Sequence, residues 1–80
     1  MTRVHVQYFA VLRERAGRSE ESVETHARTA AELYAELRER HALGLPQSLL
    51  RVAVNDEFCA WSQPLEAGDR VVFIPPVAGG

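Results

Sequence analysis

The feature that most constrains the fold is a run near the end of the chain that is apolar at consecutive positions. Residues 70–74 read Arg-Val-Val-Phe-Ile, and Pro75-Pro76 follow at once. A strand with apolar side chains on both faces is typical of the middle of a sheet that is covered on both sides. Proline cannot donate a hydrogen bond to the ladder, so we expect this strand to end at Ile74. The last strand is therefore predicted to be central, with a helix on one face and another cover on the other.

The other predicted strands are short and lie before and after a long helical segment. In residues 2–8 apolar and polar side chains alternate, which is the period-2 pattern of a strand with one buried face. A turn at Asn55-Asp56 separates two of the later strands. The remaining strands are predicted at about residues 20–25, at 51–55 and at 57–61.

Two segments have the spacing of amphipathic helices. The first covers residues 9–16, with Phe9, Leu12 and Ala16 on one side and Gly17 as a C-cap. The second begins at Thr29, because Thr29-Ala30-Ala31-Glu32 fits the capping box, and it stops near Gly44. Its predicted buried face consists of Ala30, Leu33, Tyr34, Leu37 and His41.

This order of elements predicts an α+β domain of two layers, and we favour a β-grasp arrangement. It has a mixed sheet of about five strands, with the first and last strands paired in the middle and one main helix packed across it. Eighty residues are enough for one small domain and too few to enclose a deep pocket. We place the domain at residues 1–74 and an extended tail at residues 75–80.

Composition excludes several classes of function. No stretch approaches the ~20 apolar residues of a membrane span, and a net charge of −2 provides no general attraction for nucleic acid. The first residues lack the apolar run of a secretory signal, so we expect a cytoplasmic protein. His5, His26 and His41 have no metal-ligand spacing, and we predict no metal and no bound cofactor.

A few further residues invite a simple structural interpretation. Cys59 is the only cysteine, and we interpret it as a small buried side chain in a strand rather than a nucleophile. Glu20-Glu21 is predicted to form a solvated turn. Trp61 anchors the edge of the core or a partner.

The tail is the segment best suited to chemistry. Pro75 and Pro76 favour an extended, stiff conformation, and six extended residues reach about 20 Å. Val77, Ala78 and Gly79 lead to Gly80, whose carboxylate is the reactive group that we predict. A carboxylate must first be activated, for instance as an acyl-adenylate, and the chain has no Walker-type loop with which to use ATP itself. The residues alone favour a carrier with a glycine-ended tail and leave open a plain binding module with a disordered tail.

Several segments together carry a resemblance to a known family. They are the end of the chain from Gly68 to Gly80, the pair Val54-Asn55 with its acidic turn, Phe9-Ala10 and Leu12-Arg13-Glu14. On these residues the chain resembles the ubiquitin-like sulfur carriers, and among them the small subunits of molybdopterin synthases. The similarity extends over essentially the whole chain, with little signal between Arg40 and Leu50.

The resemblance implies a cycle that uses partner enzymes. A MoeB-like adenylating enzyme activates the Gly80 carboxylate with ATP, and a sulfur donor converts it to a thiocarboxylate. The tail then enters the large synthase subunit (MoaE-like), which supplies the catalytic residues, in a heterotetramer of two small and two large subunits. There the sulfur passes to cyclic pyranopterin monophosphate. The small subunit itself is not catalytic.

The resemblance also implies a docking surface and two alternatives. In such families an exposed apolar sheet face docks partners, and Val72, Ile74 and Phe58 are the candidates here. One alternative is a related carrier that serves thiamine, cysteine or tRNA thiolation. The other is a protein modifier conjugated through Gly80.

Overall fold

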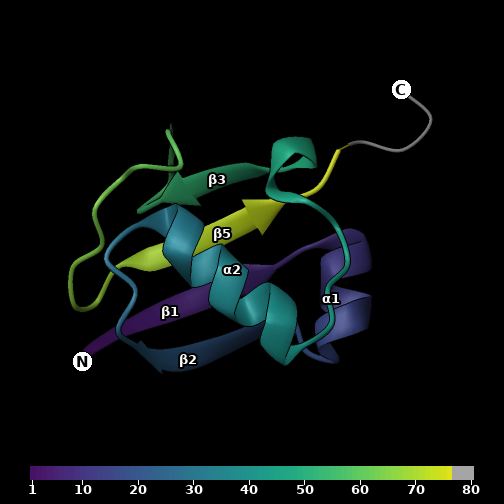
Figure 1. Ribbon diagram of the computed structural model, residues 1–80, viewed down its shortest axis with the longest axis horizontal. Helices are drawn as coiled ribbons and strands as arrows, with labels where there is room; N and C mark the ends of the chain where they lie inside the picture. Colours follow the sequence, from purple (N-terminus) through teal and green to yellow (C-terminus); the bar gives the residue numbers. More distant parts are fainter. Residues whose placement is uncertain (77–80) are drawn as a thin grey trace.

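Five strands form one mixed sheet, and a long helix lies across one of its faces (Figure 1). The computed structural model describes residues 1–76. The elements are β1 (Thr2–Tyr8), α1 (Ala10–Ala16), β2 (Glu20–Thr25), α2 (Ala30–Arg40), a 3-10 turn η1 (Gln47–Leu49), β3 (Arg51–Val54), β4 (Glu57–Cys59) and β5 (Arg70–Ile74). The predicted two-layer α+β fold, with a mixed sheet and one main helix, is confirmed.

The first and last strands lie side by side in the middle of the sheet. The strand order is β2-β1-β5-β3-β4, and β1 and β5 run parallel, with Tyr8 opposite Phe73. The other three strand pairs are antiparallel. The prediction of a central last strand is therefore confirmed, and β5 carries the chain out of the sheet at Ile74.

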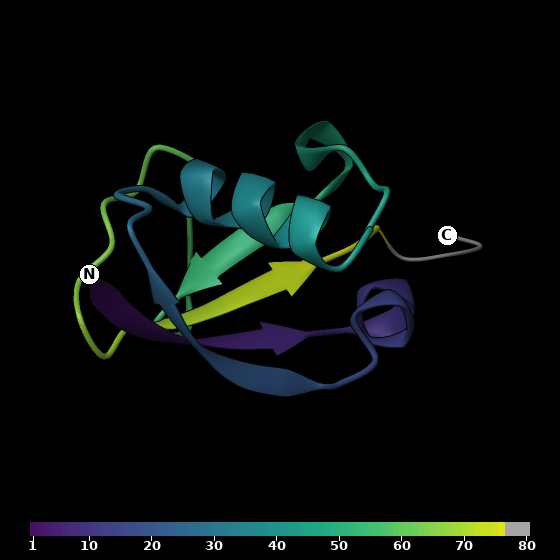
Figure 2. The same cartoon turned by 60° about the horizontal axis from the view of Figure 1, so that its bottom comes forward.

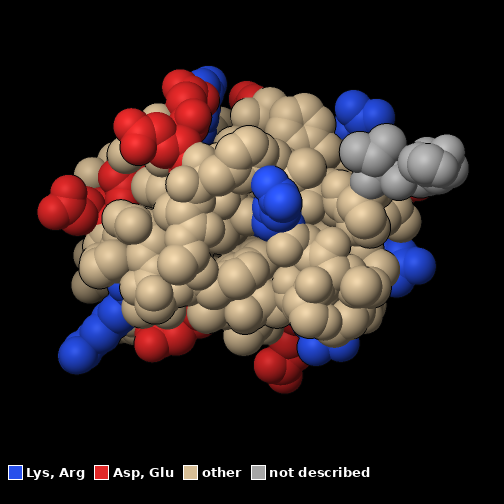
Figure 3. Space-filling view, turned by 90° about the horizontal axis from the view of Figure 1, so that it is seen from above, with Lys and Arg blue, Asp and Glu red and all other residues tan. Residues whose placement is uncertain are grey.

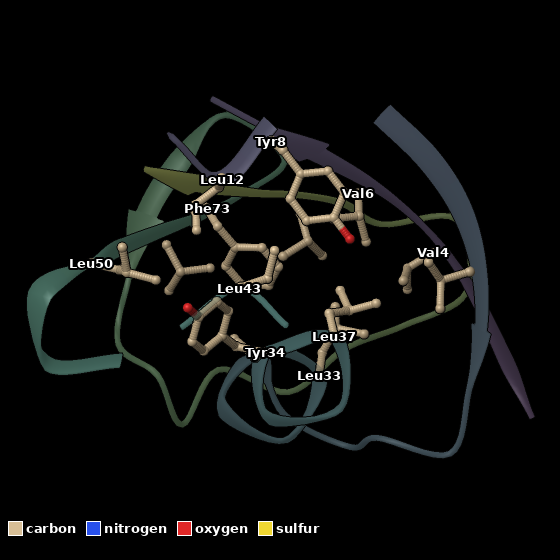
Figure 4. Packing of buried hydrophobic residues seen from close by; sticks show 14 of the residues in the cluster. Val4, Val6, Tyr8, Leu12, Leu33, Tyr34, Leu37, Leu43, Leu50 and Phe73 are labelled. Carbon is tan, nitrogen blue, oxygen red and sulfur yellow. The ribbon is translucent and has the colours of Figure 1, made fainter. Parts of the chain in front are cut away.

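The core lies between the sheet and α2 (Figure 4). The side chain of Phe73 is fully buried, and its ring centroid lies 5.1 Å from that of Tyr34 and 6.0 Å from that of Trp61. Trp61 and Phe73 are stacked with an interplanar angle of 7°. Trp61 thus packs against the core edge, as one of the two interpretations of this residue predicted.

Within the part of the chain that the structure describes, no second helix provides the cover predicted for the other face of the sheet. Figure 2 shows α2 on one face of the sheet, and no helix within residues 1–76 lies over the opposite face. Val72 and Ala53 are nevertheless mostly buried there, although neither belongs to the core cluster. The apolar pattern on both faces of β5 therefore did not require a second helix over the sheet.

The hairpin between β3 and β4 turns at Asn55-Asp56, as predicted. Both residues have positive φ, of 52° and 71°, which suits a two-residue turn between antiparallel strands. The strand after it ends at Cys59, so the predicted extension to Trp61 is wrong. The chain leaves the sheet edge there, and the indole of Trp61 packs against the edge of the core.

The ends of the helices differ in detail from the predictions. Thr29 caps α2 by accepting a hydrogen bond from Glu32 N at 3.2 Å, but the Glu32 carboxylate accepts from Arg28 N rather than from Thr29 N. The reciprocal half of the capping box therefore lies one residue earlier. Phe9 precedes α1 as its N-cap and is 41% exposed, so this helix begins one residue later than predicted and Phe9 does not share the buried side of Leu12 and Ala16.

Within the described residues, no helix has both the length and the apolar character needed to cross a membrane.

Candidate functional site

The root of the tail lies against the body of the domain. Strand β5 leads into Pro75, which is buried, and Pro76, which is exposed. Both prolines line an apolar groove of about 570 Å³ at the end of the sheet. Its other walls come from Phe9, Ala10, Val11, Leu45 and Ile74. The predicted tail residues Val77, Ala78, Gly79 and Gly80 lie outside the described residues.

One wall of this groove is a loop that three side chains hold in place. Tyr34 Oη donates to the carbonyl of Leu45 at 2.6 Å, and Arg15 Nη1 donates to the carbonyl of Leu43 at 2.9 Å. Arg38 Nη2 donates to the carbonyl of Gly44 at 3.2 Å. The donors come from α1 and α2, so the sequence of the loop alone does not reveal them.

The three predicted partner-binding residues lie on the uncovered sheet face. Val72 and Ile74 alternate along β5, and Val72 pairs with Ala53, which pairs in turn with Phe58. Phe58 is 64% exposed, whereas Val72 and Ala53 form the more protected part of the same row. Their role in binding stays a prediction, but the sheet register does bring them together.

Charged side chains are unevenly distributed around the molecule. In Figure 3, acidic groups gather at the upper left, whereas basic groups are scattered around the outline and one lies in the middle of a mainly uncharged surface. On the sheet face, the guanidinium of Arg51 lies 5.6 Å from the ring centroid of Phe58. Arg70 lies 3.8 Å from the exposed carboxylate of Asp56.

A buried polar cluster joins β1, β2 and the end of α2, and the sequence did not predict it. Tyr8 Oη donates to Glu21 Oε2 at 2.5 Å, and His41 Nε2 lies 2.8 Å from the same oxygen. Glu21 lies in β2 with only 10% of its side chain exposed, so the prediction of a solvated turn at Glu20-Glu21 is wrong. The alternation of β2 could have indicated this, because Glu21 shares a face with buried Val23 and Thr25.

Hydrogen bonding controls the ionisation of this cluster. Burial raises the pKa of Glu21, but hydrogen bonds from Tyr8 and His41, together with the charges of His41 and Arg18, outweigh burial and hold its pKa below the ordinary value. Burial, the hydrogen bond to Glu21 and the charge of Glu21 all raise the pKa of Tyr8, so its hydroxyl stays protonated. The cluster thus contains a carboxylate that the folded state stabilises.

The cluster predicts a specific dependence of stability on pH. Because the pKa of Glu21 is lower in the folded state, its stabilisation is present above the pKa of an unfolded glutamate, about 4.3, and is lost as pH falls through the folded value. We expect Glu21→Gln to lower the free energy of unfolding by about 2 kcal/mol at neutral pH, with the difference shrinking in acid. Urea unfolding at neutral and acid pH measures this difference in the free energy of unfolding. Exposed Glu20→Gln is the matched control, and equal effects of the two variants would contradict the prediction.

Cys59 and the histidines do not form a reactive site. The thiol of Cys59 is partly buried and lies 3.8 Å from the carbonyl of Val52, and burial raises its pKa. A raised pKa disfavours the nucleophilic thiolate. Within residues 1–76, no three His, Cys, Asp or Glu side chains lie close enough together to hold a metal ion.

Comparisons with known proteins agree on one family. The model of the ThiS family matches residues 6–80. The molybdopterin synthase sulfur carrier subunit of Escherichia coli (strain K12) is 36% identical over 80 residues, which cover 96% of this chain and 99% of that protein.

Solved structures with the same fold include two that are named as molybdopterin-converting factors. A putative molybdopterin converting factor subunit 1 from Pyrococcus furiosus has a TM-score of 0.80 at 31% identity and covers 96% of this chain and 100% of its own. In a complex of subunits 1 and 2 of molybdopterin-converting factor from Helicobacter pylori 26695, one chain has a TM-score of 0.69 at 28% identity. That match covers 99% of this chain and 100% of the other.

Proposed function

This chain belongs to the ThiS family, and from that membership we propose that it is the sulfur-carrier subunit of a molybdopterin synthase. The observation that carries the proposal is the similarity to the Escherichia coli sulfur carrier subunit, which extends over nearly the full length of both chains. The position of β5 supports it, because the central strand leads directly to the tail.

The proposed chemistry takes place at the carboxylate of Gly80. A carboxylate oxygen attacks the α-phosphate of ATP, pyrophosphate leaves, and an acyl-adenylate forms on a MoeB-like enzyme. A sulfur donor then displaces AMP, which leaves a thiocarboxylate on Gly80. The chain contributes the sulfur, while the activating enzyme and the large subunit contribute the catalytic groups. Because activation consumes ATP, we place this cycle in the cytoplasm.

The proposed partner of the loaded carrier is a MoaE-like large subunit, in an assembly of two small and two large chains. The Helicobacter pylori complex supports a partner of this kind, because it contains subunits 1 and 2 of a molybdopterin-converting factor. The tail would deliver the sulfur to cyclic pyranopterin monophosphate in the large subunit. As the acyl C–S bond breaks, water supplies the oxygen that replaces the sulfur, so Gly80 returns to a carboxylate and is loaded again.

Mass spectrometry of the intact protein tests the proposal directly. The protein purified from its own cells should include a form in which one C-terminal oxygen is replaced by sulfur. Mixing this form with the large subunit and the pterin precursor should yield molybdopterin and the unmodified carboxylate. Sulfur transfer only to another acceptor would indicate a related carrier, and conjugates joined to lysines through Gly80 would indicate a protein modifier. A Gly80 that stays a carboxylate when the activating enzyme, ATP and a sulfur donor are supplied would end the carrier proposal.

The proposed docking face predicts a loss of binding when its exposed aromatic residue is replaced. We expect Phe58→Asp to weaken binding to the large subunit at least ~10-fold, because a buried aromatic anchor would become a desolvated charge. Since Phe58 is exposed in the free chain, the variant protein should have nearly the melting temperature of the unchanged protein. Leu49→Asp is the matched control, because Leu49 is another exposed apolar residue and lies in η1. Calorimetric titration measures the affinity of both variants for the large subunit. Equal losses of affinity would contradict a specific role of Phe58.

A further inference from the structure

Two arginines lie at opposite ends of the apolar row on the uncovered sheet face. Arg70, Val72 and Ile74 alternate along β5 and so point to the same side, away from the core residues Val71 and Phe73. Arg51 pairs with Ile74 across β3 and β5. Arg51 therefore lies at the end of the row next to the tail root, and Arg70 lies at the other end.

Arg51 has no charge partner within residues 1–76. Its guanidinium lies over the ring of Phe58, 5.6 Å from the centroid, which holds the group beside the apolar row without neutralising it. Two other basic side chains on this face have acidic neighbours: Arg3 pairs with Glu24, and His5 lies 3.7 Å from Glu20. Arg51 is thus a positioned cation that the described part of the chain leaves free to bind a carboxylate.

Arg70 is only weakly engaged. Its Nη1 lies 3.8 Å from an oxygen of Asp56, whose side chain is 81% exposed. An ion pair of this kind between exposed groups contributes little and is easily exchanged for another. Arg70 can therefore turn to a partner's carboxylate at small cost.

The pattern on this face is that of a protein interface with a charged rim. The more protected residues Val72 and Ala53 form its apolar centre, with exposed Phe58 beside them. Interfaces commonly combine such a centre with a polar rim, and arginine pairs well with carboxylates because its planar group can donate two parallel hydrogen bonds. A partner surface that complements this face would have an apolar centre with carboxylates at two opposite edges.

We propose that the uncovered sheet face binds an acidic-rimmed apolar patch on the large synthase subunit, with Arg51 and Arg70 as its charge-specific contacts. The identity of the partner rests on the proposed function. The charge of the partner's rim rests on the geometry of this chain. Arg51 is the stronger determinant, because Phe58 orients it and it lies next to the root of the tail.

Charge reversal at three sites tests this proposal. Arg51→Glu, Arg70→Glu and Arg28→Glu change the net charge equally, but Arg28 lies in the exposed loop before α2 and away from this face. We expect calorimetric titration of the full-length chain with the large subunit to show at least ~10-fold weaker binding for Arg51→Glu and a smaller loss for Arg70→Glu. Arg28→Glu should stay within about twofold, and higher salt should narrow these differences.

The outcomes separate this proposal from the proposed function. Equal affinities of the three variants, with binding of the unchanged chain intact, would overturn the role of the arginines and leave the carrier function standing. No binding of the unchanged chain would overturn the choice of partner. A dimer in sedimentation that Arg51→Glu disrupts would show that a second copy occupies the face. Intact-mass measurement of sulfur on Gly80 decides the carrier function separately, because loading does not require the large subunit. Matching melting temperatures of the variants would exclude misfolding as the cause of any loss.

Discussion

Deletion of Gly80 is expected to abolish sulfur loading while leaving the stability of the domain unchanged. The deletion shortens the tail by one residue, about 3.5 Å when extended, and so withdraws the carboxylate from the activating site. Misplacement of a reacting group by about 1 Å can already reduce rates ~100-fold, and this displacement is larger. The core cluster of the described residues runs from Val4 to Phe73, so we expect thermal unfolding to be unaffected. Intact-mass analysis after incubation with the activating enzyme, ATP and a sulfur donor measures the loading.

A second variant separates the position of the carboxylate from the loss of one glycine. One alanine added after Gly80 keeps every native residue and moves the carboxylate outward by a similar distance. We expect this variant to load as poorly as the deletion. Normal loading of either variant would show that Gly80 is not the acceptor.

Replacement of Phe73 by alanine is expected to destabilise the domain by about 4 kcal/mol. The side chain is fully buried in the central strand and packs against Tyr34 and Trp61, so its removal leaves a cavity at the centre of the aromatic cluster. Stabilities of small domains are about 5–15 kcal/mol, so this loss approaches the total for a chain of this size. Urea unfolding followed by tryptophan fluorescence is suitable, because Trp61 is the only tryptophan and contacts the site.

The neighbouring residue provides the control for that experiment. Val72 lies in the same strand, but its side chain is on the uncovered face and outside the core cluster. Val72→Ala removes fewer atoms from a site that borders solvent, so it should cost well under half as much. Similar costs for the two variants would contradict the assignment of the core to the α2 side of the sheet.

Patterns within short segments predicted the elements well. The alternation in residues 2–8 and the glycine after Ala16 correspond to β1 and to the C-cap of α1, where Gly17 has a φ of 76°. Errors arose where a side chain served the tertiary structure rather than its own segment. The indole of Trp61 packs on Phe73 and ends β4 early, and Glu21 turns inward to meet Tyr8 and His41.

The candidate site was predictable only in part. Val72, Ile74 and Phe58 could be named as apolar residues of strands, and the structure places them on one face. The groove at the tail root could not be predicted, because its walls come from α1, β5 and the loop after α2. The approach of Arg51 to Phe58 could not be predicted either, because it depends on the pairing of two strands across a turn.

From the sequence by itself, the last strand had to be central, and it had to end at Ile74. Apolar side chains at consecutive positions must avoid water on both sides, and proline stops the ladder. Only the tertiary structure decided that α2 covers one side of this strand and that no helix within residues 1–76 covers the other. It also decided that an arginine lies at each end of the open row. Periodicity records which side chains avoid water, but strand register determines which residue lies opposite another, and register depends on contacts between segments far apart in the chain.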